Sequence, residues 1–160
     1  MSLIEVTITL LCLAIAAMVV FPTLSDTAPE QLRGAAQVVI ADLQFAQGQS
    51  MSRGDDPRLV VFEPGRNGYS IAPKSEPNKP IKHPIGGDKY VTKFGKGPAA
   101  SVGKVRLGAV NVGGDDQLGF GGLGQLDQTT PATITLVAGA RSIVITIDPI
   151  TGDTTVGPIQ

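Results

Sequence analysis

The distribution of apolar and polar positions divides the chain into two parts of different character. Residues 1–25 are apolar almost throughout, with Glu5 as their only charged side chain, and Pro22 interrupts the run near its end. Further along, apolar residues recur at helical spacing up to residue 53. We therefore expect one long helix over residues 2–53 with a break at Pro22, because proline removes a backbone hydrogen bond and crowds the preceding turn.

The second half of this expected helix is amphipathic. Its apolar and small residues recur every three or four positions, which indicates a face that packs on a sheet. The stripe consists of Leu32, Ala36, Val39, Leu43, Ala46 and Ser50, widened by Ile40 and Met51. The residues expected to face elsewhere are Gly34, Gln37, Asp42, Gln44 and Gln49.

The remainder of the chain has the alternation and the turn residues of short β-strands. Strands are predicted at 58–62, 69–72, 105–112, 117–120, 132–137, 142–147 and 154–156. Asn67–Gly68 is the strongest hairpin signal, and residues 138–141 form a second hairpin turn. Residues 73–104 are rich in proline, glycine and lysine and are expected to form an irregular loop with a short strand at 89–94.

The predicted fold class is α+β: a long N-terminal hydrophobic α-helix followed by a β-rich, antiparallel, sandwich-like globular head. Residues 1–27 would be a transmembrane or filament-core helix segment, and residues 28–160 the globular head with the C-terminal half of the helix. The head is long enough to bury one core. Because Cys12 is the only cysteine, an intrachain disulfide is excluded and packing must hold the head together.

The N-terminal residues resemble the mature N-terminus of type IV pilins and pseudopilins. Ser2–Val6 matches the processing motif of that family, Met1 replaces the more common Phe, and Pro22 falls where many pilins have a proline. The resemblance implies that Met1 is exposed by prepilin peptidase and methylated on its nitrogen, an inference that fails if Met1 is the initiator. It also implies that subunit assembly depends on Leu3, Ile4, Glu5, Val6 and Ile8.

Looser motifs resemble the GspH/FimT branch of the same superfamily. They are residues 41–46 in the helix, Leu118–Phe120 with the glycines up to Gly124, and Thr151–Val156. The resemblance implies a non-enzymatic structural subunit of a type IV pilus-like filament, or of a type II secretion pseudopilus. Such a subunit would lie in the bacterial inner membrane before assembly. It would then form a homo-oligomeric helical filament, extracellular or periplasm-spanning, together with other pilins or pseudopilins.

The sequence also allows other functions to be considered. The alternative within the superfamily is a minor tip pilin-like protein that binds DNA for uptake through the lysines of residues 73–104. The net charge of −1 gives no broad attraction to nucleic acid, which is therefore not an expected partner. A secretory signal peptide would need a basic start, which residues 1–25 lack. A plain single-pass anchor would leave Glu5 unexplained.

The candidate chemistry is sparse. His83 is the only histidine and is interpreted as a solvated loop residue. Asp115 with Asp116, and Asp148 with Asp153, offer carboxylate oxygens of the kind that bind calcium. The sequence contains no catalytic motif that would support a membrane-anchored enzyme, and neither a metal nor a cofactor is predicted.

Overall fold

The chain is described by a computed structural model that covers residues 2–20 and 27–160, with side chains described for residues 2–16 and from 27 onward. Helix α1 (Leu3–Val20) is followed by helix α2 (Ala28–Ser52) and by two antiparallel sheets of four strands each. The first sheet has the order β3-β2-β1-β5, with β1 (Arg58–Glu63), β2 (Gly68–Pro73), β3 (Val91–Lys93) and β5 (Gln117–Gly119). The second has the order β4-β6-β7-β8, with β4 (Arg106–Asn111), β6 (Ala132–Ala138), β7 (Arg141–Ile147) and β8 (Thr154–Val156).

The prediction of one long N-terminal hydrophobic helix is wrong. The structure has two helices in its place, α1 with 18 residues and α2 with 25 residues. The reason lies in the change of pattern, because α1 is apolar all round whereas α2 has one apolar stripe that packs on the sheets. Thr27 is the N-cap of α2, and Pro29 occupies its first turn, where the missing N–H costs no helical hydrogen bond. The predicted helix break at Pro22 lies outside the described residues.

Among the described residues, no helix combines the length and the apolar character needed to cross a membrane.

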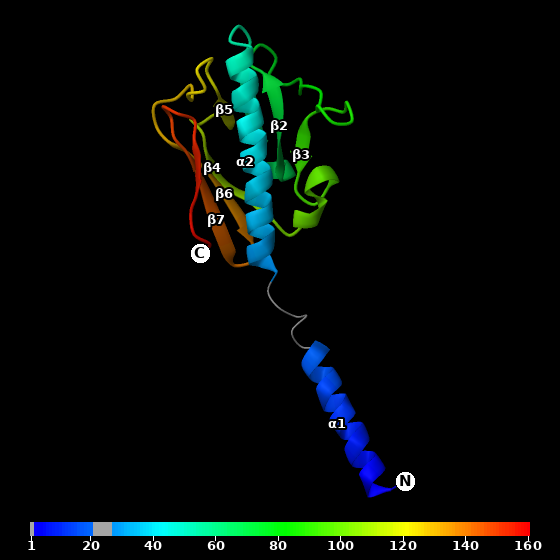
Figure 1. Ribbon diagram of the computed structural model, residues 1–160. Helices are drawn as coiled ribbons and strands as arrows, with labels where there is room; N and C mark the ends of the chain where they lie inside the picture. Colours follow the sequence, from blue (N-terminus) through cyan, green and yellow to red (C-terminus); the bar gives the residue numbers. More distant parts are fainter. Residues whose placement is uncertain (1, 21–26) are drawn as a thin grey trace.

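Helix α2 lies along both sheets and joins them into one core (Figure 1). It contacts β1 of the first sheet and β6 and β7 of the second. Its buried residues are Leu32, Ala35, Ala36, Val39, Leu43, Ala46 and Ser50, which confirms the predicted stripe. Met51, predicted to widen the stripe, is 56% exposed, because it lies in the last turn of α2, at the end of the packed interface.

The end of α2 is tied to the start of β1 by a buried serine. The Ser50 hydroxyl donates to the Ala46 carbonyl at 2.9 Å and accepts a hydrogen bond from the backbone N–H of Arg58 at 2.8 Å. This pair of bonds satisfies polar groups that would otherwise be buried without partners. Ser50 therefore fits the buried face of α2 because its hydroxyl is hydrogen-bonded both as donor and as acceptor and because its side chain is small.

The predicted strands all have counterparts in the structure, with ends that differ by one or two residues in most cases. The segment 73–104 differs more, because it contains the 3₁₀ helix η3 (Gly97–Val102) in addition to β3. Val102 in η3 is buried against the core, and its side chain approaches Gly34 of α2. Gly34, predicted to face away from the sheet, is therefore the residue of α2 on which η3 packs.

The β1–β2 hairpin is closed by η2 (Pro64–Arg66) and Asn67, which adopts left-handed backbone angles of φ 52° and ψ 50°. The Asn67 side chain also crosses to the second sheet. Its Nδ2 donates to the Val105 carbonyl at 3.0 Å, and its Oδ1 accepts from the Leu107 N–H at 2.6 Å. A turn residue of one sheet thus fixes the first residues of β4 in the other.

The last residues of the chain continue the second sheet beyond β8. Gly157 donates its N–H to the Val144 carbonyl at 2.8 Å. Ser142 and Gln160 exchange two backbone hydrogen bonds of 3.0 and 2.9 Å. The segment 157–160 therefore covers the part of the β7 edge that the three-residue strand β8 leaves open.

Candidate functional site

Helix α1 is an apolar surface without a partner in the isolated chain. Every residue from 2 to 16 is exposed, and the exposed fraction of its large apolar side chains runs from 42% at Val6 to 83% at Leu3. Figure 1 shows α1 apart from the two sheets and α2. An exposed apolar surface of this extent marks an interaction site. Leu3, Ile4, Val6 and Ile8, the predicted assembly residues, all lie on this surface.

Apart from the charged Glu5, the polar side chains of α1 add little polarity to this surface. Thr7 donates its hydroxyl to the Ile4 carbonyl at 2.9 Å, and Thr9 donates to the Val6 carbonyl at 2.9 Å. The hydrogen-bond donors of both threonines are thus satisfied inside the helix. Glu5 lies in the first turn, where the helix dipole favours a negative charge.

The carboxylate of Glu5 forms no ion pair within the residues that the structure describes. Met1, the predicted site of processing and methylation, lies outside the described residues. The structure therefore brings together Glu5 and the four apolar assembly residues on α1, and leaves the Met1 prediction as it stood.

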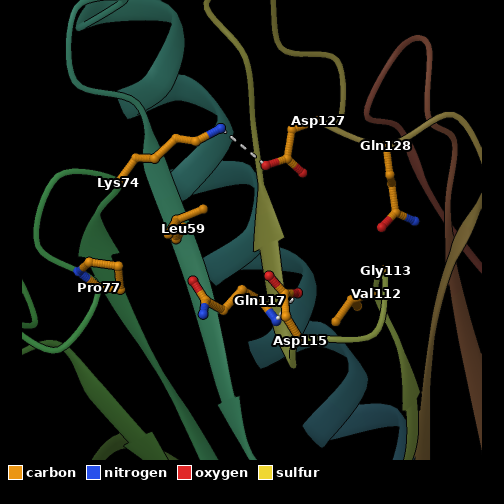
Figure 2. Close-up of a pocket in the computed structure, with 9 residues that line it drawn as sticks. All are labelled: Leu59, Lys74, Pro77, Val112, Gly113, Asp115, Gln117, Asp127 and Gln128. Carbon is orange, nitrogen blue, oxygen red and sulfur yellow. Dashed lines mark hydrogen bonds and ion pairs between the residues drawn. The ribbon is translucent and has the colours of Figure 1, made fainter.

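A shallow polar groove lies at one end of the first sheet (Figure 2). It has a volume of about 340 Å³ and is lined by Leu59, Lys74, Pro77, Val112, Gly113, Asp115, Gln117, Asp127 and Gln128. Lys74 extends across it and pairs with Asp127, with 3.3 Å between Nζ and Oδ2. Both side chains are more than one third exposed, so solvent screens the pair and it contributes little to stability. The lining of the groove contains no serine, threonine, cysteine or histidine side chain.

The half-buried carboxylate of Asp42 is the centre of a hydroxyl cluster that the sequence did not reveal. It accepts hydrogen bonds from Tyr69 Oη at 2.7 Å, Tyr90 Oη at 2.9 Å and Thr92 Oγ1 at 2.9 Å. Asp42 was predicted to face away from the sheet, and that prediction is wrong. The cluster joins α2 to β2 and β3, and the ring of Phe45 stacks on Tyr90 with 5.2 Å between the centroids.

The environment of the two tyrosines suppresses their ionisation. Burial raises the pKa of Tyr69 well above its usual range, and the negative charge of Asp42 raises it further. The same two causes, in the same order, raise the pKa of Tyr90. A phenol that stays protonated is a hydrogen-bond donor and not a general base, so the cluster has a structural role.

The remaining candidate residues form turns. His83 Nδ1 forms a hydrogen bond with the backbone of Ile85, as donor or acceptor according to its tautomer. The centroid of the His83 ring lies 4.4 Å from the centroid of the Tyr90 ring. The carboxylate of Asp148 accepts the N–H groups of Thr151 and Ile150, which together lower its pKa. Within residues 2–20 and 27–160, no group of three or more His, Cys, Asp or Glu side chains is placed to hold a metal ion.

Comparisons with protein-family models, with curated proteins and with solved structures find no match for this chain.

Proposed function

We propose that this protein is a structural subunit of a type IV pilus-like or type II secretion pseudopilus filament, which polymerises through α1. The observation that carries the proposal is the exposure of an apolar helix beside a head that has its own core. Packing of α1 against the same helix of other copies removes this apolar surface from water, at roughly 25 cal/mol per Å² buried. The resemblance of residues 1–6 to processed pilins supports the same function.

Glu5 would fix the position of each α1 helix along its neighbours in the filament. In the proposed filament its carboxylate pairs with the α-amino group of Met1 in a neighbouring copy. A carboxylate buried without a partner costs several kcal/mol, so only arrangements that supply the partner are stable. The inner-membrane location before assembly, the maturation by prepilin peptidase and the presence of other pilins in the filament remain predictions.

The test uses the full chain and two matched substitutions. Val6 on α1 and Val156 on β8 are each 42% exposed, so Val6→Asp and Val156→Asp place the same charge at equally accessible apolar positions. We expect the parent and Val156→Asp to form filaments visible by electron microscopy, and Val6→Asp to sediment as a monomer. Filaments of Val6→Asp as abundant as those of the parent would refute assembly through α1.

DNA uptake remains the alternative function, and no contact in the described head favours it. Of the seven lysines in residues 73–104, Lys74 pairs with Asp127 and Lys79 pairs with Glu76. Duplex DNA binding that weakens steeply with salt, together with loss of that binding when the remaining lysines are replaced, would favour uptake over a purely structural role.

A further inference from the structure

Two segments of the head have charges of mostly opposite sign. Residues 79–106 contain six lysines, Arg106 and a single carboxylate, Asp88, whereas residues 107–160 contain five aspartates and one basic residue, Arg141. The strand order β3-β2-β1-β5 places β3, within the basic segment, at one edge and β5, within the acidic segment, at the other. Figure 1 shows β3 and β5 on opposite sides of α2.

The basic edge carries a set of lysines that we call the basic face. They are Lys82, Lys89, Lys93, Lys96 and Lys104, and none of them forms an ion pair within the described part of the chain. A hollow of about 430 Å³ lies beside Lys89, and its other lining residues are His83, Ile85, Asp88, Val91 and Pro98. Ile85 is 82% exposed at its rim. The basic face therefore combines unpaired positive charge with an apolar depression.

The acidic face is formed by Asp115 and Asp116, directly before β5 of the first sheet, and by Asp148 and Asp153, in the turn between β7 and β8 of the second sheet. All four side chains are exposed, and none forms an ion pair among the described residues. Leu126, in the loop after β5, donates its N–H to the Pro149 carbonyl at 2.9 Å in the loop that holds Asp148 and Asp153, and Asp115 lines the same groove as Asp127 and Gln128 of the loop after β5. Leu123 and Ile150 project beside them, 87% and 81% exposed, around an apolar hollow of about 560 Å³.

We propose that the basic face of one copy docks on the acidic face of the next. The unpaired charges are opposite in sign. An apolar hollow with an exposed aliphatic side chain adjoins Lys89 on the basic face, and another adjoins the turn of Asp148, whose carboxylate accepts the Ile150 N–H, on the acidic face. An apolar centre with a polar rim is the usual composition of a protein interface. Because the two faces differ, the contact is heterologous, and its repetition builds an open polymer when the rotation between copies does not close a ring. The inference rests on the proposed function in taking a second copy of this chain as the partner.

The test reverses the charge of one face at a time in the full chain. The first variant carries Lys93→Glu and Lys96→Glu, and the second carries Asp115→Lys and Asp153→Lys. The control carries Arg33→Glu and Arg66→Glu, the same charge change as the first variant but outside both faces. Thermal melts first establish that all three are folded, and association is then measured by sedimentation at low and high salt.

We expect each face variant to bind itself about tenfold more weakly than the parent at low salt, since like charges then meet at the contact. An equimolar mixture of the two face variants restores association, because every contact between the two variants again joins opposite charges. The control associates as the parent does. Face variants that associate as tightly as the parent at every salt concentration, or a mixture that gives no recovery, would overturn the inference.

Carbodiimide cross-linking separates failure of this inference from failure of the proposed function. The reagent joins lysines and carboxylates in direct contact, and a mixture of ¹⁵N-labelled and unlabelled protein identifies links between copies. We expect links from lysines of the basic face to aspartates of the acidic face. Filaments that depend on α1 but lack these links overturn the inference and leave the proposed function standing. Links without filaments support the docking and overturn assembly through α1.

Discussion

At the scale of single residues, one carboxylate holds together a helix and two strands. Replacing Asp42 with alanine leaves the hydroxyls of Tyr69, Tyr90 and Thr92 without their acceptor. A buried donor without a partner costs about 1–3 kcal/mol, and water can reach part of this cluster. We expect Asp42→Ala to lower the free energy of unfolding by about 2–4 kcal/mol in urea titrations. Asp88→Ala, which removes an exposed loop carboxylate, serves as the control and should change it by less than about 0.5 kcal/mol.

The two tyrosines of the chain provide a direct measurement of this environment. The pKa values of Tyr69 and Tyr90 are both raised in the folded state, first by burial and then by the charge of Asp42. The stability from these shifts is present below the unfolded pKa, near 10, and is lost as the pH rises through the folded values. We expect no phenolate absorbance at 295 nm near pH 10 until circular dichroism shows unfolding. A phenolate signal near pH 10 from folded protein would contradict the cluster.

Gly68, at the start of β2 in the β1–β2 hairpin, has no room for a side chain. A Cβ atom on Gly68 would lie 2.4 Å from the Thr92 carbonyl oxygen of the neighbouring strand, whereas one on Gly65 in the same hairpin would meet nothing within 4 Å. Relieving the clash must shift β2 or β3, at a cost of about 1–3 kcal/mol. We expect Gly68→Ala to lower the midpoint of thermal unfolding by several degrees, and Gly65→Ala to leave it nearly unchanged. Equal midpoints would mean that β3 adjusts freely.

At the scale of elements, periodicity predicted the strands and the buried stripe of α2, because both patterns are local. It predicted the helix boundary wrongly, since an apolar run and an amphipathic run were joined into one helix although only the amphipathic run packs on the sheets. Asp42 was also missed, because its hydroxyl partners lie 27, 48 and 50 residues away in the sequence. The candidate assembly residues on α1 were identified from sequence, but their common exposure is a property of the folded chain.

The charge of Glu5 on α1 leads to a separate prediction. Glu5→Gln keeps the shape of the side chain and removes its charge, so the proposed pairing with the α-amino group of a neighbouring Met1 is lost. We expect filament yield to fall sharply, while the unfolding midpoint of the head stays that of the parent. Filament counts by electron microscopy at equal protein concentration measure the effect. Assembly equal to that of the parent would show that Glu5 does not direct the packing of α1.

At the scale of the whole molecule, the head contains all the elements that bury its core. The buried apolar residues run from Leu32 to Ile147, so none comes from the part of α1 whose side chains are described, residues 3–16. We expect a fragment of residues 28–160 to be monomeric at low concentration and to unfold in one cooperative thermal transition. Measurement by calorimetry and sedimentation checks both properties. A fragment that lacks a transition would show that neighbouring copies, and not its own core, keep the head folded.

The segment 157–160, bound along β7, has a consequence for the proposed polymer. An open strand edge offers a row of free N–H and C=O groups to any other chain, which is the starting point of amyloid-like growth. Deletion of these four residues would uncover the backbone of Ser142 and Val144, both of which now pair with the segment. By occupying this edge, the segment disfavours uncontrolled strand addition, so that growth of the proposed polymer would fall to other surfaces, such as α1.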